Sequence, residues 1–221
     1  MKPSAGYRFC SLPADRELIV SLLPQVSTLA QKYAISEESV HDFARAGAGP
    51  SLRVLPQLQL EGFLGCPLGE AELVDRLRFI DSFQVAITDA NPPLLAGYCY
   101  GYGEAACAAL VADGRTRSWE DRELFEHGER HHSRFSVNFQ VAVDPAHVGH
   151  GLGTRLATAV TQEVAEVESS PCLLWVLLYP FNKMGFRIAT KCGFRLAQTF
   201  PSTDHDSFIW GELELHRGNG Y

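Results

Sequence analysis

Two spacings of apolar residues follow one another along the chain, and together they predict both helices and strands. Where apolar residues recur every three or four positions, the pattern is that of a helix with one buried face. With capping residues such as Asp15, this spacing predicts helices at residues 15–33, 36–45, 73–80, 152–167 and 182–192, and a helix start at 118–121. Short apolar runs bounded by turn residues predict strands at residues 7–12, 83–88, 94–102, 135–143, 173–178, 195–200 and 207–215. Pro24 is expected to kink or break the first helix, and residues 47–69 are expected to form a long loop.

The order of these elements indicates the fold class. The strands at 83–88 and 94–102 flank a turn sequence at 89–93, so they are expected to form a hairpin. The strand at 135–143, the helix that follows it and the strand at 173–178 have the order of a parallel β-α-β crossover. We therefore predict an α+β fold, with a mixed, mainly antiparallel sheet of about seven strands flanked by helices.

Composition and charge then restrict the function classes. The 221 residues are 46% apolar, enough for one domain over 1–221, with a charged insertion at 103–134. A net charge of −7 without any basic cluster argues against a nucleic-acid partner. No apolar run approaches the roughly 18 residues of a membrane span, and the N-terminus lacks a signal core, so we expect a cytoplasmic protein. The six cysteines form no CxxC pair and have no histidine at metal-ligand spacing, which favours reduced buried thiols and no metal.

The most informative segment is the sequence V-G-H-G-L-G at residues 148–153, between an apolar strand and an amphipathic helix. Glycines let the backbone approach a ligand closely, and the start of a helix favours negative charge, so a phosphate or diphosphate is the expected ligand. A dinucleotide fingerprint does not fit, because the spacing is G-x-G-x-G and the next strand ends in Tyr179-Pro180 rather than an acidic residue. A P-loop does not fit either, because no Lys-Ser or Lys-Thr follows the last glycine.

This segment resembles the acyl-CoA-binding motif Q/R-x-x-G-x-G/A of the GNAT superfamily of N-acyltransferases. Farther on, Asn182 precedes Lys191-Cys192-Gly193-Phe194, similar to the second motif of that superfamily, an Asn-led helix that ends in K-x-G-F. The resemblance implies a GNAT-like fold and direct transfer of an acetyl group from acetyl-CoA to a primary amine of a small molecule or peptide. The carrier-binding residues that it implies are Val141, Val143, Val148, Gly149, His150, Gly151, Gly153, Thr154 and Asn182. Asn182 could instead cap its own helix.

The implied transfer needs groups that move protons. An alkyl amine with a pKa near ~10 must lose a proton before it attacks, which costs about 4 kcal/mol at pH 7. The candidates for these groups are Glu104, His132, Asn138 and Tyr100. The Asn138 amide could hold a water that relays the proton, and the Tyr100 hydroxyl could act as the acid that protonates the departing thiolate. Each of the four also has a structural interpretation. Glu104 could cap a helix and His132 could be a surface residue. Asn138 could belong to a row of hydrogen-bonded side chains, and Tyr100 could be a core aromatic residue. The developing oxyanion needs a donor where strands splay, for which a backbone N–H near Val141 to Val143 is expected.

Two positions depart from the superfamily pattern and keep other functions open. Val148 stands where Gln or Arg is usual, and Ala189 stands where many members place a tyrosine that protonates the departing thiolate. One alternative is therefore a GNAT-fold CoA-binding protein without transfer activity. The unusual segments 40–70 and 103–134 suggest another, a transferase or decarboxylase for a longer acyl group on CoA or a carrier protein. The acceptor amine and the formation of a homodimer are left open by the sequence.

Overall fold

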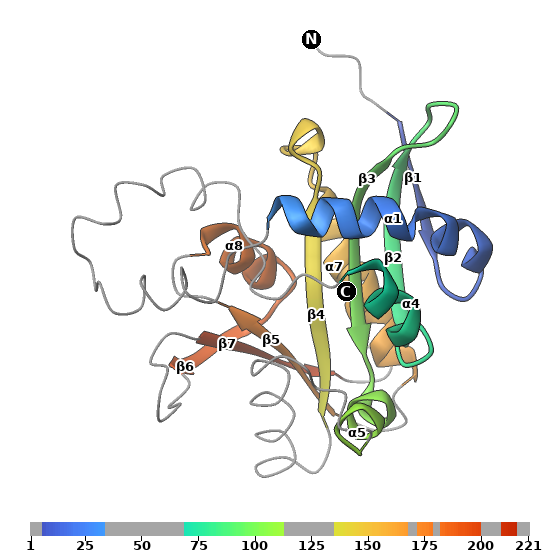
Figure 1. Ribbon diagram of the computed structural model, residues 1–221. Coiled ribbons are helices and arrows are strands. Elements are labelled where there is room, and N and C mark those ends of the chain that lie inside the picture. Colours follow the sequence, from blue (N-terminus) through green and yellow to red (C-terminus); the bar gives the residue numbers. More distant parts are fainter. Residues whose placement is uncertain are drawn as a thin grey trace.

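The computed structural model describes residues 6–33, 69–112, 135–167, 172–178, 182–199 and 209–215. The strands are β1 (Tyr7–Ser11), β2 (Ser82–Thr88), β3 (Leu95–Tyr102), β4 (Phe135–Val143), β5 (Cys172–Leu178), β6 (Arg195–Thr199) and β7 (Ile209–Leu215). The α-helices are α1 (Arg16–Lys32), α4 (Glu70–Arg76), α5 (Glu104–Ala112), α7 (Leu152–Val167) and α8 (Lys183–Lys191). Helices α1, α4 and α5 lie on one face of the sheet and α7 on the other (Figure 1). The α+β class predicted from the sequence is confirmed.

The described strands form one sheet in the order β1-β2-β3-β4-β5-β7-β6. Strands β1 to β4 pair antiparallel with one another in sequence order, and the predicted β2–β3 hairpin is present. Strand β5 pairs parallel with β4 after the crossover through α7, but this pairing covers only Phe135–Val137 of β4. Strand β7 lies between β5 and β6 and is antiparallel to both. Beyond Val137 the two central strands therefore diverge, as Figure 1 shows.

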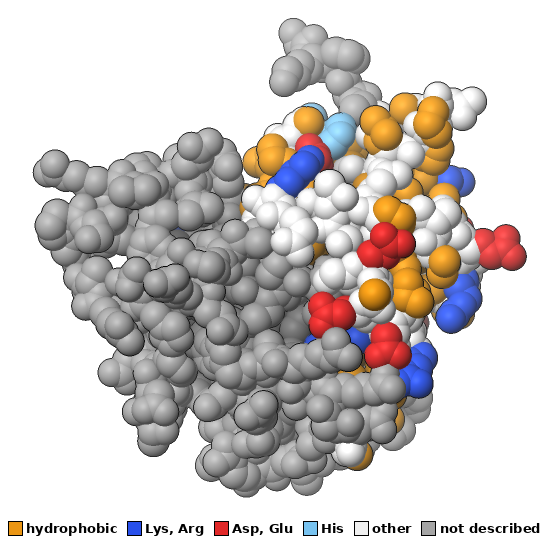
Figure 2. Space-filling model, in the orientation of Figure 1, with side chains coloured by type: hydrophobic (Ala, Val, Ile, Leu, Met, Phe, Trp, Pro, Cys, Tyr) orange, Lys and Arg blue, Asp and Glu red, His pale blue; other side chains and the backbone are white. Residues whose placement is uncertain are grey.

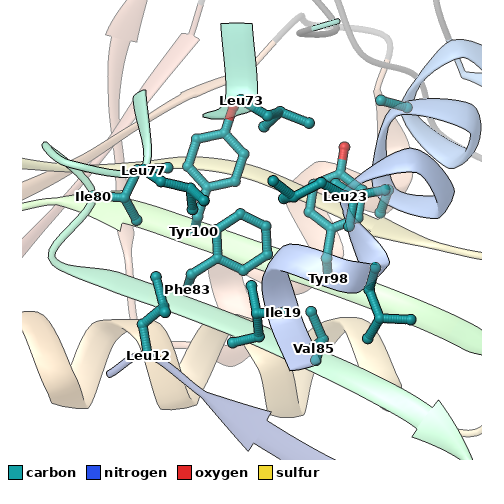
Figure 3. Close-up of a cluster of buried hydrophobic side chains, with 14 of the residues drawn as sticks. Leu12, Ile19, Leu23, Leu73, Leu77, Ile80, Phe83, Val85, Tyr98 and Tyr100 are labelled. Carbon is teal, nitrogen blue, oxygen red and sulfur yellow. The ribbon is translucent and has the colours of Figure 1, made fainter. Parts of the chain in front are cut away.

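Aromatic side chains fill the space between the sheet and helices α1 and α4. Phe83 stacks on Tyr100 with 5.5 Å between ring centroids and on Tyr98 with 6.2 Å. Figure 3 shows these rings standing on the sheet among Ile19, Leu23, Leu73 and Leu77. Because Tyr98, Tyr100 and Tyr102 alternate with residues that face the opposite side of the strand, all three enter this core and are 0% exposed.

Helix α7 covers the opposite face of the sheet. Its apolar residues Leu152, Leu156, Val160 and Val164, spaced four positions apart, are at most 1% exposed. They pack against small residues of β2 and β3, such as Ala86 and Ala96. This packing fixes the direction of α7, and with it the position of the glycine loop from which the helix begins.

Several sequence expectations need correction. Helix α1 runs without a break through Pro24, and Asp15 precedes it without a side-chain capping bond, since its carboxylate accepts from the Ser11 N–H instead. Val74, one of the apolar residues whose spacing predicted the helix at 73–80, is 54% exposed rather than buried. The segment 104–112 is an apolar helix with buried Cys107 and Leu110, so the first part of the expected charged insertion belongs to the core. The predicted elements at 36–45, 47–68 and 118–121 lie outside the described residues. Among the described helices, none is long and apolar enough to cross a membrane.

Candidate functional site

The glycine loop connects β4 to α7 through a short 3₁₀ turn at Pro145–His147. Asp144 begins this turn, and its carboxylate accepts a hydrogen bond from the Ala146 N–H at 2.9 Å. Gly149 and Gly151 have φ angles of 92° and 74°, a left-handed conformation that glycine adopts without the steric cost other residues incur. A Cβ atom at either position would meet no atom within 4 Å, so the loop has open space beside both glycines.

Backbone N–H groups gather at this loop. Within the described parts of the chain, no group accepts a hydrogen bond from the N–H of residues 149–154, and the first bond of α7 runs from Arg155 N–H to the Gly151 carbonyl at 3.1 Å. The beginning of a helix carries a partial positive charge from the aligned peptide dipoles. A row of free donors in that field can bind an anion such as a phosphate or diphosphate.

Gly153 differs from the two glycines before it. A Cβ atom there would lie 2.8 Å from Ile188 Cδ1 and 3.5 Å from Val143 Cγ2. The residue therefore lets α8 approach the start of α7, rather than opening the loop to a ligand. Its predicted contact with a carrier could be made only through its backbone N–H.

The divergence of β4 from β5 leaves backbone groups of β4 directed away from the sheet ladder. Asp144 N–H donates to the Ala96 carbonyl at 2.8 Å, so Asp144 and Ala96 are a hydrogen-bonded pair of the β3–β4 ladder. Along an antiparallel pair, residues that hydrogen-bond to the partner strand alternate with residues that do not. By that alternation, the N–H groups of Val141 and Val143 point away from β3, towards the side where β5 no longer pairs. One extra residue of β4, Phe139, is inserted at the register shift, and such bulges bend and twist a strand.

Helix α1 and strand β1 hold the base of the loop. The Tyr33 hydroxyl donates to the Val143 carbonyl at 2.6 Å, and Lys32 Nζ lies 2.7 Å from Asp144 Oδ2. Strand β1 contributes Tyr7, whose hydroxyl shares a 3.1 Å hydrogen bond with Nδ1 of His147. No local pattern in the sequence marks Lys32, Tyr33 or Tyr7, because their partners are 110 to 140 positions away.

The Asp144 carboxylate stays ionised through these contacts. Partial burial by itself raises the pKa of the carboxyl, but the hydrogen bonds from Lys32 and the Ala146 N–H outweigh this effect. The net result is a pKa below the ordinary value for aspartate. The turn that precedes the glycine loop is therefore anchored by a charged side chain at neutral pH.

Side chains around the loop add to the site unevenly. Val148 is 42% exposed and carries no polar atom, so any anion contact at this position comes from the backbone. His150 is exposed beside the Tyr7 ring, with 5.7 Å between ring centroids. Arg155 places its guanidinium 4.0 Å above the Phe9 ring. Positive or polar groups thus border the loop on the β1 side.

The candidate proton-transfer residues do not lie together. Tyr100 is fully buried on the α1 face of the sheet, whereas the side chain of Val141 packs on the α7 face. Glu104 begins α5, two residues after Tyr102, the partner of Val137. Val137 is itself four strand residues, or ~13 Å, from Val141 along β4, and Glu104 follows on the side away from Val141. His132 lies outside the described residues. For Asn138 the structure describes the backbone, which pairs with Gly101 of β3.

The second sequence motif forms α8 as expected. The Asn182 side chain accepts from the Gly185 N–H at 2.9 Å, so it caps its own helix. Gly193 follows the helix with a φ of 89°, and Ala189 is 4% exposed within the core under α7. Among the described residues, no three His, Cys, Asp or Glu side chains come together as a metal site requires.

Comparison with known proteins finds one family model that matches part of the chain and several solved structures with a similar fold. The family model described as FR47-like protein matches residues 122–200. Among solved structures, the ribosomal-protein-S18-alanine N-acetyltransferase from Escherichia coli has a TM-score of 0.51 at 15% identity, covering 98% of this chain and 99% of its own. A GNAT superfamily phosphinothricin acetyltransferase from Sinorhizobium meliloti, in complex with acetyl-CoA, has a TM-score of 0.52 at 13% identity, covering 97% and 90%. No curated protein sequence matches the chain.

A third similar structure is that of yncA from Salmonella typhimurium, with its cofactor acetyl-CoA. Its TM-score is 0.54 at 13% identity, and the match covers 97% of this chain and 96% of that one. The chain has the GNAT fold, as the resemblance of its two motifs implied.

Proposed function

We propose that the protein transfers an acetyl group from acetyl-CoA to a primary amine of a small molecule or peptide, as one domain over residues 1–221. The observation that carries this proposal is the row of N–H groups at residues 149–154, which have no acceptor among the described residues. Two similar folds, at 13% identity, are described with acetyl-CoA bound. The anion that the loop would hold is the diphosphate of this carrier.

The residues of the loop fit such a ligand. Hydrogen bonds from backbone N–H groups to a charged oxygen are about twice as strong as neutral ones, so several of them compensate for the apolar Val148. The Thr154 hydroxyl and the His150 ring add polar contacts at the edge of the loop. The free space at Gly149 and Gly151 leaves room for the phosphate groups against the backbone.

The transfer itself would take place along the free edge of β4. The N–H groups of Val141 and Val143 face the side where β5 diverges, so they can bind the arm of the carrier and stabilise an oxyanion. Asn138 lies on the same strand, next to the bulge, where its amide could hold a water that accepts the proton of the amine. Glu104 begins α5 beyond the level of Val137, which is ~13 Å from Val141 along β4, so it would receive that proton through water rather than directly.

Calorimetric titration with acetyl-CoA, followed by an assay of thiol release with a panel of amines, tests the proposal. We expect binding of acetyl-CoA and release of CoA thiol with at least one amine. Absence of acetyl-CoA binding would refute it. Acetyl-, malonyl- and octanoyl-CoA should be compared, because faster turnover of a longer acyl group would identify a different transferase.

A second candidate is a CoA-binding protein without transfer activity. The buried Ala189 favours it, since this position offers no hydroxyl to protonate a departing thiolate. This candidate predicts binding of CoA with no thiol release across the amine panel. A single amine that turns over would exclude it.

A further inference from the structure

The last turn of α1 contacts the chain where β4 passes into the glycine loop. The Tyr33 hydroxyl donates to the Val143 carbonyl, and Lys32 forms an ion pair with Asp144. Figure 2 shows basic, acidic and histidine side chains gathered at this place, over the ends of α1 and β4. The two contacts differ in their surroundings, because Tyr33 is 7% exposed whereas the Lys32 side chain is 49% exposed.

The Val143 carbonyl belongs to the edge of β4 that points away from β3. Strand β5 stops pairing at Val137, so no strand in the described chain provides a donor to this carbonyl. The Tyr33 hydroxyl, 2.6 Å away, provides one. A carbonyl that loses its donor in a partly buried position costs free energy, so this hydrogen bond fixes the last residue of β4 before the loop.

We propose that Tyr33 is a positioning residue for the acyl carrier. Its hydroxyl holds the end of β4 so that the N–H groups of Val141 and Val143 and the loop at 148–153 keep one arrangement before the carrier binds. This inference rests on the proposed function. Without the hydrogen bond, that backbone would have to become ordered on binding, which weakens affinity. Lys32 contributes less, because exposed ion pairs contribute little.

The test compares Tyr33→Phe with the wild type by calorimetric titration with CoA. One neutral hydrogen bond corresponds to a 3- to 10-fold rise in Kd, roughly, and the KM for acetyl-CoA should rise by the same factor while kcat at saturating donor changes little. Tyr98→Phe is the matched control, because its hydroxyl donates to Gln140 Oε1 at 3.3 Å inside the core. We expect it to change the unfolding temperature and leave the Kd unchanged. Lys32→Gln should change the Kd by less than about twofold.

A purely structural role would lower the unfolding temperature of Tyr33→Phe without changing its Kd, and this result would overturn the inference while the proposed function stands. Should the wild type itself fail to bind CoA, the proposed function and the role of Tyr33 would be refuted together. For the case that Tyr33→Phe does not fold, 3,5-difluorotyrosine at position 33 keeps the shape. Its hydroxyl loses the proton below the usual tyrosine pKa of about 10, so CoA affinity should fall as the pH rises through that lower pKa. A pH-independent affinity would overturn the inference.

Discussion

Substitution of Gly151 by Glu and by Gln tests the anion site with a matched pair. Both side chains must adopt the φ of 74° at this position, so both variants lose a similar stability of about 1–2 kcal/mol relative to the wild type. Neither side chain meets protein atoms near its Cβ, because the position faces open space. The two variants therefore differ in one negative charge at the beginning of α7.

That charge should have opposite effects on the free and the bound protein. In the free protein, an acidic side chain at a helix N-terminus contributes about 0.3–1 kcal/mol, so Gly151→Glu should unfold about 1–3 °C above Gly151→Gln. In the complex, the carboxylate would lie about 6 Å from the diphosphate and repel it by about 0.7–1.4 kcal/mol per phosphate charge, for an effective dielectric constant of about 40–80. With two charges, the Kd for CoA should be about 10- to 100-fold higher for Gly151→Glu than for Gly151→Gln.

Scanning fluorimetry of the free variants and calorimetric titration with CoA at about 0.02 M and about 0.5 M salt measure both effects. The ratio of the two Kd values should shrink at high salt because the repulsion is screened. Equal Kd values at low salt, or a ratio that salt does not change, would refute the placement of the diphosphate beside Gly151. A Glu variant less stable than the Gln variant would refute the assignment of free N–H groups and positive field at this helix start.

Three further predictions concern the frame around the site. Gly97→Ala should destabilise the protein by about 1–3 kcal/mol in urea unfolding. The added Cβ would lie 2.8 Å from the Ala142 carbonyl oxygen and 3.3 Å from Val143 Cα, and these backbone atoms cannot move aside as a side chain can. Unchanged stability would contradict this close contact. Burial raises the pKa of the Cys99 thiol well above its usual value, so the thiol does not act as a nucleophile that carries the acetyl group. Cys99→Ala should therefore keep transfer activity within about twofold. Loss of the activity in a folded variant would contradict direct transfer. Because the pKa of Asp144 is lowered in the folded protein, its contribution to stability is present above about pH 4 and lost as the pH falls through the folded pKa. The unfolding temperature of the wild type should therefore fall more steeply below about pH 4 than that of Asp144→Asn, and parallel curves would show that the carboxylate is not stabilised.

The sequence was sufficient for features that depend on neighbouring residues. The spacing of Leu152, Leu156 and Val160 predicted α7, and the glycines before it predicted a loop whose backbone could meet an anion. Gly193 predicted the end of α8, where the structure has a left-handed residue. These signals are local because helix periodicity, capping and positive φ each involve residues within a few positions of one another.

The same local signals left the side-chain roles undecided. Tyr100 and Asn182 each had a chemical and a structural interpretation, and only the fold showed a ring buried on the α1 face and an amide that caps α8. Pro24, expected to kink or break its helix, lies inside α1 without a break. In each case the packing of distant segments overrides the preference of a single residue.

What the sequence by itself determined is the described helices and strands other than α5, and a loop suited to a phosphate group. Only the tertiary structure decided that β4 separates from β5 after Val137, that β7 inserts between β5 and β6, and that Tyr33 reaches the Val143 carbonyl. Pairing between strands and contacts across a hundred residues depend on which surfaces bury the most apolar area together, and that is a property of the whole chain rather than of any window within it.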